Sequence, residues 1–87
     1  MAPAGTPIEQ RHEATRHAMR WLIPNPRLDG VAADVAQLVS GLAQDLILVL
    51  DDGIELTAGL RKLREGKDCF VLQALEDSQE DSQEGSS

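Results

Sequence analysis

Basic side chains are concentrated in one stretch of the C-terminal half, DGIELTAGLRKLREGK, which spans residues 52–67. Its four cations are Arg61, Lys62, Arg64 and Lys67. Helical spacing places Thr57 one turn before Arg61 on the same face. A hydroxyl and a guanidinium held in this way can both donate hydrogen bonds to one phosphate group. The pattern therefore indicates a binding site for an anion.

The same cations also have a purely structural interpretation. Arg61 and Glu65, like Arg64 and Asp68, are four residues apart and could form ion pairs on a solvated helix face. Each such pair is worth about 0.3–0.5 kcal/mol. Lys67 stands between two apolar positions and could lie along them with its amine reaching water. The residues alone leave both interpretations open.

A second group of polar residues lies along the N-terminal helical stretch. His12, Arg16 and Arg20 recur every fourth residue and form one stripe on a helix. Trp21 adds the only large aromatic face of this region, and a nucleobase could stack on it. Alternatively, the indole closes the helical bundle. Cations on two helices suit a small anionic ligand, which needs only two or three of them.

Residues that would support catalysis are scarce. Cys69 lacks the second cysteine of a CxxC motif and is expected to be a buried, small apolar residue. His12 and His17 are five residues apart, so they do not converge on a metal ion as an i, i+4 pair would. The sequence has no glycine-rich phosphate loop and no zinc-protease motif. We therefore expect a protein that is not an enzyme and uses no cofactor or metal.

Net charge limits the class of partner. The chain carries 15 acidic and 8 basic side chains, a formal net charge of −7, which disfavours extended DNA or RNA. Five of the acids lie after Ala74 with no accompanying cation, and without them the charge is −2. The tail DSQEDSQEGSS holds no apolar residue whose burial could offset its ordering entropy. Residues 77–87 are therefore expected to be a disordered acidic tail.

Hydrophobic spacing predicts an all-α fold, and an aromatic content of 2% is low for a β-sandwich. The expected elements are a flexible arm at 1–7, a helix at 8–22, a connector at 23–29, a helix at 30–50 and a helix at 54–76. Thr6 and Pro7 suit the start of the first helix. Asp52 with Glu55 fits a capping box at the start of the third.

The second of these helices has more apolar surface than one neighbouring helix can cover. One stripe consists of Val31, Val35, Leu38, Leu42, Leu46 and Val49. A second stripe consists of Ala32, Ala36, Val39, Ala43 and Leu50. The short turn that follows should fold the second and third helices into an antiparallel hairpin. Residues 8–76 are therefore expected to form a helical hairpin domain that assembles as a compact homo-oligomer.

Composition also predicts the compartment. A lone cysteine suits a reducing cytoplasm. No uninterrupted apolar run reaches the ~20 residues of a membrane span, and the N-terminus MAPAGTPIEQ lacks the regions of a signal peptide. We expect a soluble intracellular protein that does not contact membranes.

Two segments resemble a known family, the small phage-encoded anti-CBASS proteins that act as cyclic-nucleotide sponges; some anti-Thoeris sponges share the family's hairpin domain. The first, His12-Glu13-Ala14-Thr15-Arg16, is similar to the family's His-x-x-Ile-Arg on its N-terminal helix. The second, Gly53-Ile54-Glu55 followed by Leu60-x-Lys62-Leu63-x-Glu65-Gly66, is similar to the family's turn and its Ala-Leu-x-Lys-Leu-x-Glu-Ala helix.

The resemblance implies a homohexameric sponge that binds cyclic di- or trinucleotide immune signals without cleaving them. It also implies action in the cytoplasm of an infected bacterial host, where removal of the messenger blocks CBASS-type defence. Family members hold the ligand between protomers, with the N-terminal helix of one and the hairpin of another. Carried over to this chain, the resemblance supports His12, Arg16, Glu55 and Lys62 as binding residues, with Arg61 beside them.

Residue types and resemblance together predict eight ligand-binding residues: His12, Arg16, Arg20, Trp21, Glu55, Thr57, Arg61 and Lys62. The predicted function is sequestration of a cyclic oligonucleotide; an ADP-ribose-type signal is left open. The alternative is a non-catalytic helical protein-interaction or phage assembly module, whose apolar second helix docks another protein. Matched cations on two helices favour the sponge, because a docking module has no need of them.

Overall fold

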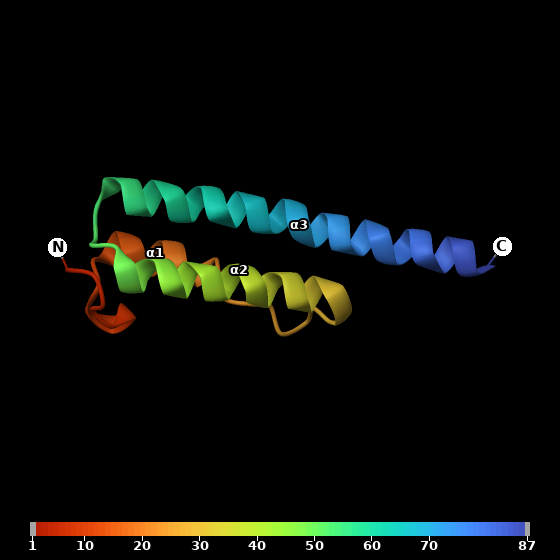
Figure 1. The fold of residues 1–87 in the computed structure, drawn as a ribbon, viewed down its shortest axis with the longest axis horizontal. Helices are drawn as coiled ribbons and strands as arrows, with labels where there is room; N and C mark the ends of the chain where they lie inside the picture. The colour runs from red at the N-terminus through yellow and green to blue at the C-terminus, as the bar shows by residue number, and fades with distance from the viewer. Residues whose placement is uncertain (1, 87) are drawn as a thin grey trace.

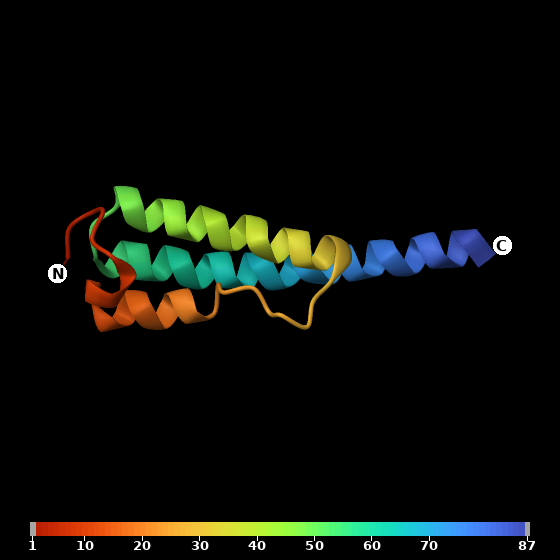
Figure 2. The same ribbon diagram turned by 90° about the horizontal axis from the view of Figure 1, so that it is seen from below.

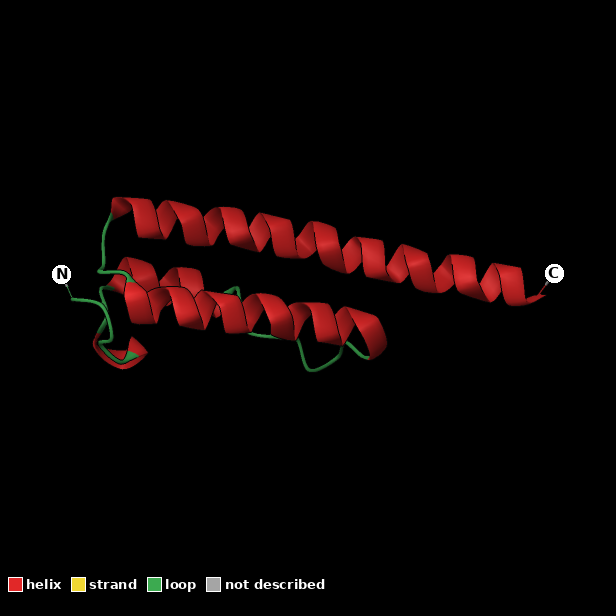
Figure 3. Cartoon of the chain, in the orientation of Figure 1, coloured by secondary structure: helices red, strands yellow, loops and turns green. Residues whose placement is uncertain are grey.

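The chain folds into helices alone. The computed structural model describes residues 2–86, with side chains as far as Gln79. Every regular element in that part of the chain is helical (Figure 3), which confirms the all-α class. The elements are a 3₁₀ turn η1 (Ile8–Gln10) and the α-helices α1 (Glu13–Arg20), α2 (Gly30–Val49) and α3 (Ile54–Ser86).

Helix α3 is the longest element, and the other two helices pack against it. Helix α1 lies along the beginning of α3, and α2 runs beside α3 past its midpoint, on a different side of it (Figures 1 and 2). The last turns of α3 extend past both neighbours, so the molecule measures 56 × 19 × 18 Å. The side chains that α1 and α3 direct at one another therefore lie at the broader end of the molecule.

The core lies where the three helices overlap. Its buried side chains come from all three helices and from the residues just after α1: Ala18, Met19, Leu22, Val39, Ala43, Ile47, Leu56 and Leu60. Leu22 and Leu60 are the largest apolar side chains that are fully buried. Each contributes about 1.5–3 kcal/mol through burial. This cluster fixes α1 against α3.

Helix α2 turns its stripe of small residues toward the core. Ala32, Ala36, Val39 and Ala43 are buried, whereas the stripe with larger side chains faces solvent. In the stripe with larger side chains, Leu38 is 73% exposed. Small side chains allow α2 to approach its neighbours closely, which explains which of the two predicted stripes is buried. The apolar surface anticipated from the sequence is thus left uncovered in the single chain.

Helix α2 is also long and apolar enough to cross a membrane by length and composition, with a mean hydropathy of 1.4 and 33% of its most apolar window buried. The expectation that no segment is long and apolar enough to cross a membrane does not hold for α2. That expectation counted only runs of apolar residues without a polar residue among them. Core helices of soluble proteins pass the same test.

The N-terminal region differs from the prediction. The expected single helix at 8–22 is divided, because the chain is extended at Arg11 and His12 between η1 and α1. Pro7 precedes η1 without any side-chain cap. The arm expected to be flexible is bound to the turn between α2 and α3. Its Ala2 carbonyl accepts a hydrogen bond from the Asp52 amide at 2.8 Å.

The C-terminal region differs as well. Helix α3 continues to Ser86, past the predicted end at 76, so the part of the expected disordered tail that the structure describes is helical. This segment contains no proline, and the Gln73 side chain donates to Asp77 at 2.8 Å across one turn. Adding a residue to an existing helix costs little once the helix has begun. Cys69, expected to be buried, is exposed.

Candidate functional site

The buried carboxylate of Asp52 organises the end of the molecule where the site lies. Its Oδ1 accepts hydrogen bonds from the Arg11 Nε at 2.9 Å and from the Thr15 hydroxyl at 2.7 Å. Its Oδ2 accepts from the backbone amides of His12 at 2.7 Å and Ala2 at 3.0 Å. All four donors belong to the N-terminal segment. The predicted capping box on α3 was therefore wrong, because Asp52 binds across the fold instead.

Arg11 connects this carboxylate to the end of α2. Its side chain is fully buried, and among the described residues Arg11–Asp52 is the one ion pair. The two terminal nitrogens donate to the carbonyls of Ile47 and Leu50, the latter at 2.7 Å. Carbonyls at a helix C-terminus lack partners within the helix and carry partial negative charge. Arg11 thus caps α2 and neutralises Asp52 at the same time.

The hydrogen bonds of Asp52 determine its pKa. Burial on its own raises the pKa, because desolvation disfavours the charged carboxylate. The hydrogen bonds from His12, Thr15, Arg11 and Ala2 outweigh burial and hold the pKa well below its usual range. Asp52 therefore stays ionised in the folded protein.

Acid is expected to destabilise the fold through Asp52. An aspartate in an unfolded chain has a pKa of ~3.9. Because the pKa of Asp52 is lower in the folded chain, its contribution to stability is complete above the unfolded-state pKa and is lost as the pH falls toward the folded-state pKa. We expect the free energy of unfolding, measured with urea and circular dichroism, to fall between about pH 5 and pH 2. The fall should be shallower in Asp52→Asn. Equal slopes in the two proteins would contradict the lowered pKa.

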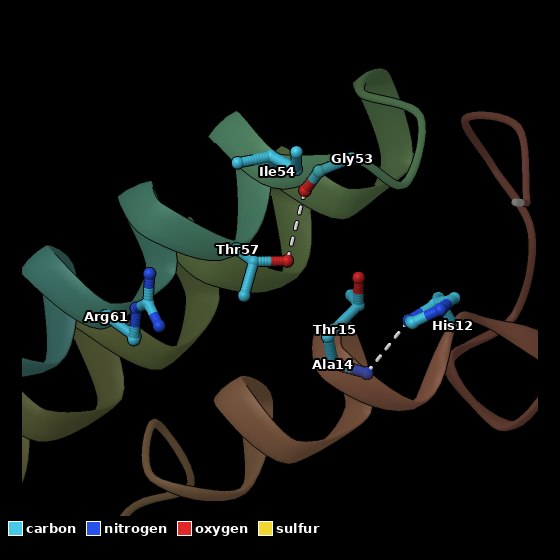
Figure 4. Close-up of a pocket in the computed structure, with 7 residues that line it drawn as sticks. All are labelled: His12, Ala14, Thr15, Gly53, Ile54, Thr57 and Arg61. Carbon is cyan, nitrogen blue, oxygen red and sulfur yellow. Dashed lines mark hydrogen bonds between the residues drawn. The ribbon is translucent and has the colours of Figure 1, made fainter.

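A pocket of about 280 Å³ lies next to this network, between the first turns of α1 and α3. His12, Ala14 and Thr15 line it from α1 and the residue before that helix, and Gly53, Ile54, Thr57 and Arg61 line it from α3 and the residue before that helix. Figure 4 shows these side chains around the space between the two helices. The pocket thus brings together three of the eight predicted residues: His12, Thr57 and Arg61.

Electrostatics make this pocket favourable for an anion. The first turns of α1 and α3 both border it, and a helix N-terminus carries a partial charge of about +0.5. Arg61 adds a full positive charge. Its side chain is exposed and forms no ion pair among the described residues, so the predicted Arg61–Glu65 pair is absent there. Two helix N-termini and Arg61 therefore lie beside one small space, next to the Arg11–Asp52 ion pair.

The remaining polar groups of the pocket are partly committed to the fold. The Thr57 hydroxyl donates to the Gly53 carbonyl at 3.0 Å, so its proton is used inside α3. This finding weakens the predicted pairing of Thr57 with Arg61 on one phosphate. The His12 Nδ1 accepts a hydrogen bond from the Ala14 amide at 3.1 Å and caps α1. In the neutral ring the proton then lies on Nε2, which can donate to a ligand.

The other five predicted residues do not line this pocket. Arg16 and Arg20 are exposed on α1, and Lys62 is exposed on α3. Glu55 lines a different hollow with Leu50, at the end of the molecule. Sequence reasoning missed Ala14, Thr15, Gly53 and Ile54. Three of them are small and uncharged, so charge and helical spacing did not single them out.

Trp21 holds α1 against α3. The guanidinium of Arg64 lies 4.0 Å from the centre of the indole ring, and the predicted Arg64–Asp68 pair is absent among the described side chains. The Lys67 amine donates to the Trp21 carbonyl at 2.7 Å, at the C-terminus of α1. Arg64 and Lys67, two of the four cations clustered on α3, therefore contact the C-terminal end of α1 and stabilise its packing. This arrangement supports the interpretation in which Trp21 closes the bundle.

Comparison of the chain with protein-family models, with curated proteins and with solved structures finds no match. Functional inference therefore rests on the residues and on the geometry of this pocket.

Proposed function

We propose that the protein binds and sequesters a small phosphate-bearing ligand of the cyclic di- or trinucleotide class, without cleaving it. The observation that carries this proposal is that the first turns of two helices and the Arg61 side chain line one pocket. Phosphate groups are the ligands that such an arrangement favours, because backbone amides and a guanidinium both donate to anionic oxygens. His12 Nε2 supplies a further donor at the edge of the pocket.

Binding without cleavage fits the chemistry of the lining. The Thr15 and Thr57 hydroxyls both donate to acceptors within the fold, so neither is activated as a nucleophile. The Nδ1 of His12 is occupied by its capping bond, and the ring therefore lacks the orienting acceptor that a general base usually has. Recognition of charge, rather than attack on the ligand, is the task these groups can perform.

The size of the pocket suggests that a second copy completes it. Small-molecule sites usually enclose ~300–1,000 Å³, and the pocket of one chain lies at the lower limit. A cyclic oligonucleotide would extend beyond it toward Arg16 or toward another protomer. We propose that the chain works as a helical hairpin in a homo-oligomer, with a hexamer implied by the resemblance. In an infected bacterium such a sponge would silence CBASS-type defence.

The proposal can be tested with a panel of cyclic di- and trinucleotides and an ADP-ribose derivative. Calorimetry of the purified protein should reveal saturable binding of at least one cyclic nucleotide. Heat denaturation of the complex should then return that nucleotide chemically intact, as chromatography would show. Recovery of a linear product would identify an enzyme instead.

The exposed stripe of α2 favours a second candidate, a non-catalytic helical module for protein interaction or phage assembly. Leu38 and Val49 are 73% and 69% exposed, and such apolar surface commonly marks an interface. This candidate predicts that no member of the nucleotide panel binds at millimolar concentration. Nucleotide binding that is weakened in Arg61→Ala would show that protein interaction is not the sole function of the chain.

A further inference from the structure

An apolar groove lies between α2 and the middle of α3, away from the pocket between α1 and α3. Its lining includes four large apolar side chains that are between 49% and 73% exposed: Val31, Leu38, Leu42 and Phe70. The pocket between α1 and α3 is lined instead by the first turns of those helices. Figure 1 shows that α2 and α3 begin at opposite ends of the region where the helices overlap. A ligand in the pocket and a partner in the groove could therefore bind at the same time.

The wall that α2 contributes has the spacing of a surface that receives a helix. Val31, Val35, Leu38 and Leu42 follow one another at intervals of four, three and four residues. This spacing keeps their side chains on one line along α2. The line covers about 16 Å, or roughly three helical turns. A partner helix of that length could place its own apolar side chains in the groove at matching intervals.

Acidic side chains border this line on both sides. Asp34 and Asp45 line a second hollow, which shares Leu38 and Leu42 with the groove but lies on the other side of them. Asp77 lines the groove from α3. All three aspartates are exposed and form no ion pair among the described residues. Among those residues, no lysine or arginine lines the groove or the second hollow.

The second hollow has room for a long side chain of a partner. Gly41 lines it between the two aspartates of α2, and a Cβ atom added to Gly41 would meet nothing within 4 Å. A lysine or arginine could lay its methylene groups over this backbone and reach Asp34 or Asp45 with its charged end. A glutamate in the same place would be repelled. The hollow therefore favours a basic side chain.

We infer that the groove between α2 and α3 binds a basic amphipathic helix of another protein. The apolar side chains of that helix cover the line from Val31 to Leu42. Its cations face Asp34 and Asp45 on one side and Asp77 on the other. Charge complementarity selects this partner, because a second copy of the chain or an anionic membrane surface would bring negative charge against the same aspartates.

This inference gives the interaction module considered above a partner of defined chemistry, and it does not rest on nucleotide binding. Helix α2 contains no lysine or arginine, and neither does the chain after Lys67. The complementary charge must therefore come from outside these segments. The second copy in the proposed function completes the pocket between α1 and α3, so it leaves the groove free.

A peptide titration of the full chain tests the inference. The probe is a labelled peptide of about 18 residues that contains only leucine and lysine, with leucine at every third or fourth position. Fluorescence anisotropy should show saturable binding, about tenfold weaker at ~500 mM than at ~50 mM salt. Two control peptides should not bind: one with glutamate in place of lysine, and one in which leucine and lysine alternate strictly.

One pair of variants tests the apolar line. Leu38→Ser should weaken binding of the lysine peptide by about tenfold, because it removes the most exposed apolar side chain of the groove. Leu72→Ser is the matched control and should bind the peptide like wild type. Leu72 is 60% exposed but lies outside the groove.

A second pair tests the charges. Asp34→Asn/Asp45→Asn should weaken binding of the lysine peptide by about tenfold at low salt. Glu9→Gln/Glu65→Gln changes the net charge by the same amount at exposed positions that line neither hollow. This control should reduce affinity by less than about threefold, through long-range electrostatics alone.

The inference is wrong if the lysine peptide does not bind, if either control peptide binds as tightly, or if the two members of a variant pair lose equal affinity. Sedimentation equilibrium adds a further test, since self-association that Leu38→Ser abolishes would place a second copy in the groove instead. Nucleotide calorimetry on the same samples separates the two proposals. Nucleotide binding without peptide binding would refute the groove assignment alone. Peptide binding without nucleotide binding would refute the proposed sponge alone.

Discussion

Replacement of Asp52 by alanine is expected to lower the free energy of unfolding by about 3–5 kcal/mol. The substitution would leave the buried Arg11 guanidinium without its counterion. It would also remove the acceptor of the Thr15 hydroxyl and of two backbone amides. Small domains are stabilised by only ~5–15 kcal/mol in total, so a loss of this size should be evident in urea denaturation followed by circular dichroism.

Asp51 provides the matched control for this experiment. It is the neighbouring aspartate, it is exposed, and its Oδ1 accepts one hydrogen bond from the Ala4 amide. Asp51→Ala should therefore cost only about 0.5–1.5 kcal/mol. The double variant Arg11→Ala/Asp52→Ala should lose less than the sum of its single variants, because no buried charge remains unpaired. Similar losses for Asp51→Ala and Asp52→Ala would refute the role of Asp52 as the centre of this network.

The local pattern of the chain predicted the helices but not this network. Hydrophobic spacing located α2 and the beginning of α3 to within a residue, because those helices bury apolar faces. The division of the first helix at Arg11 could not be predicted in this way. It depends on a partner 41 positions further along, and nothing in local spacing pairs Arg11 with Asp52 rather than with a nearer acid. For the same reason the arm was predicted to be flexible.

Loss of the Arg61 guanidinium is expected to weaken nucleotide binding by ten- to a hundredfold. A charge-assisted hydrogen bond to phosphate is worth roughly 1.5–3 kcal/mol, and Arg61 is the cation that lines the pocket. Calorimetry of Arg61→Ala against the nucleotide identified in the panel measures the loss directly. Stability should change little, because Arg61 is exposed and forms no ion pair among the described residues.

Lys62 is the matched control for Arg61. Its removal changes the net charge of the protein by the same amount, and it comes from the next position of the same helix, outside the pocket. Lys62→Ala should therefore reduce affinity less than threefold, through long-range electrostatics alone. Equal losses for the two variants would mean that the nucleotide does not bind in the pocket between α1 and α3.

The candidate site was only partly predictable for a related reason. Charge and helical spacing identified Arg61, Thr57 and His12, and the resemblance supported His12 as well. Spacing cannot show which face of α3 receives α1, and that contact determines that Arg61 lines the pocket while Arg64 stacks on Trp21. The contribution of the two helix N-termini depends on their convergence, which only the folded chain displays.

The central claim is that the first turns of α1 and α3 bind an anionic ligand, and amide chemical shifts test it most directly. A uniformly ¹⁵N-labelled sample would be titrated with the cyclic nucleotide that binds most tightly in the panel. The largest shifts should fall on the amides of Ala14, Thr15, Gly53 and Ile54, and Arg61→Ala should reduce them at equal ligand concentration. Shifts concentrated on α2, or the same shifts in Arg61→Ala, would contradict the account.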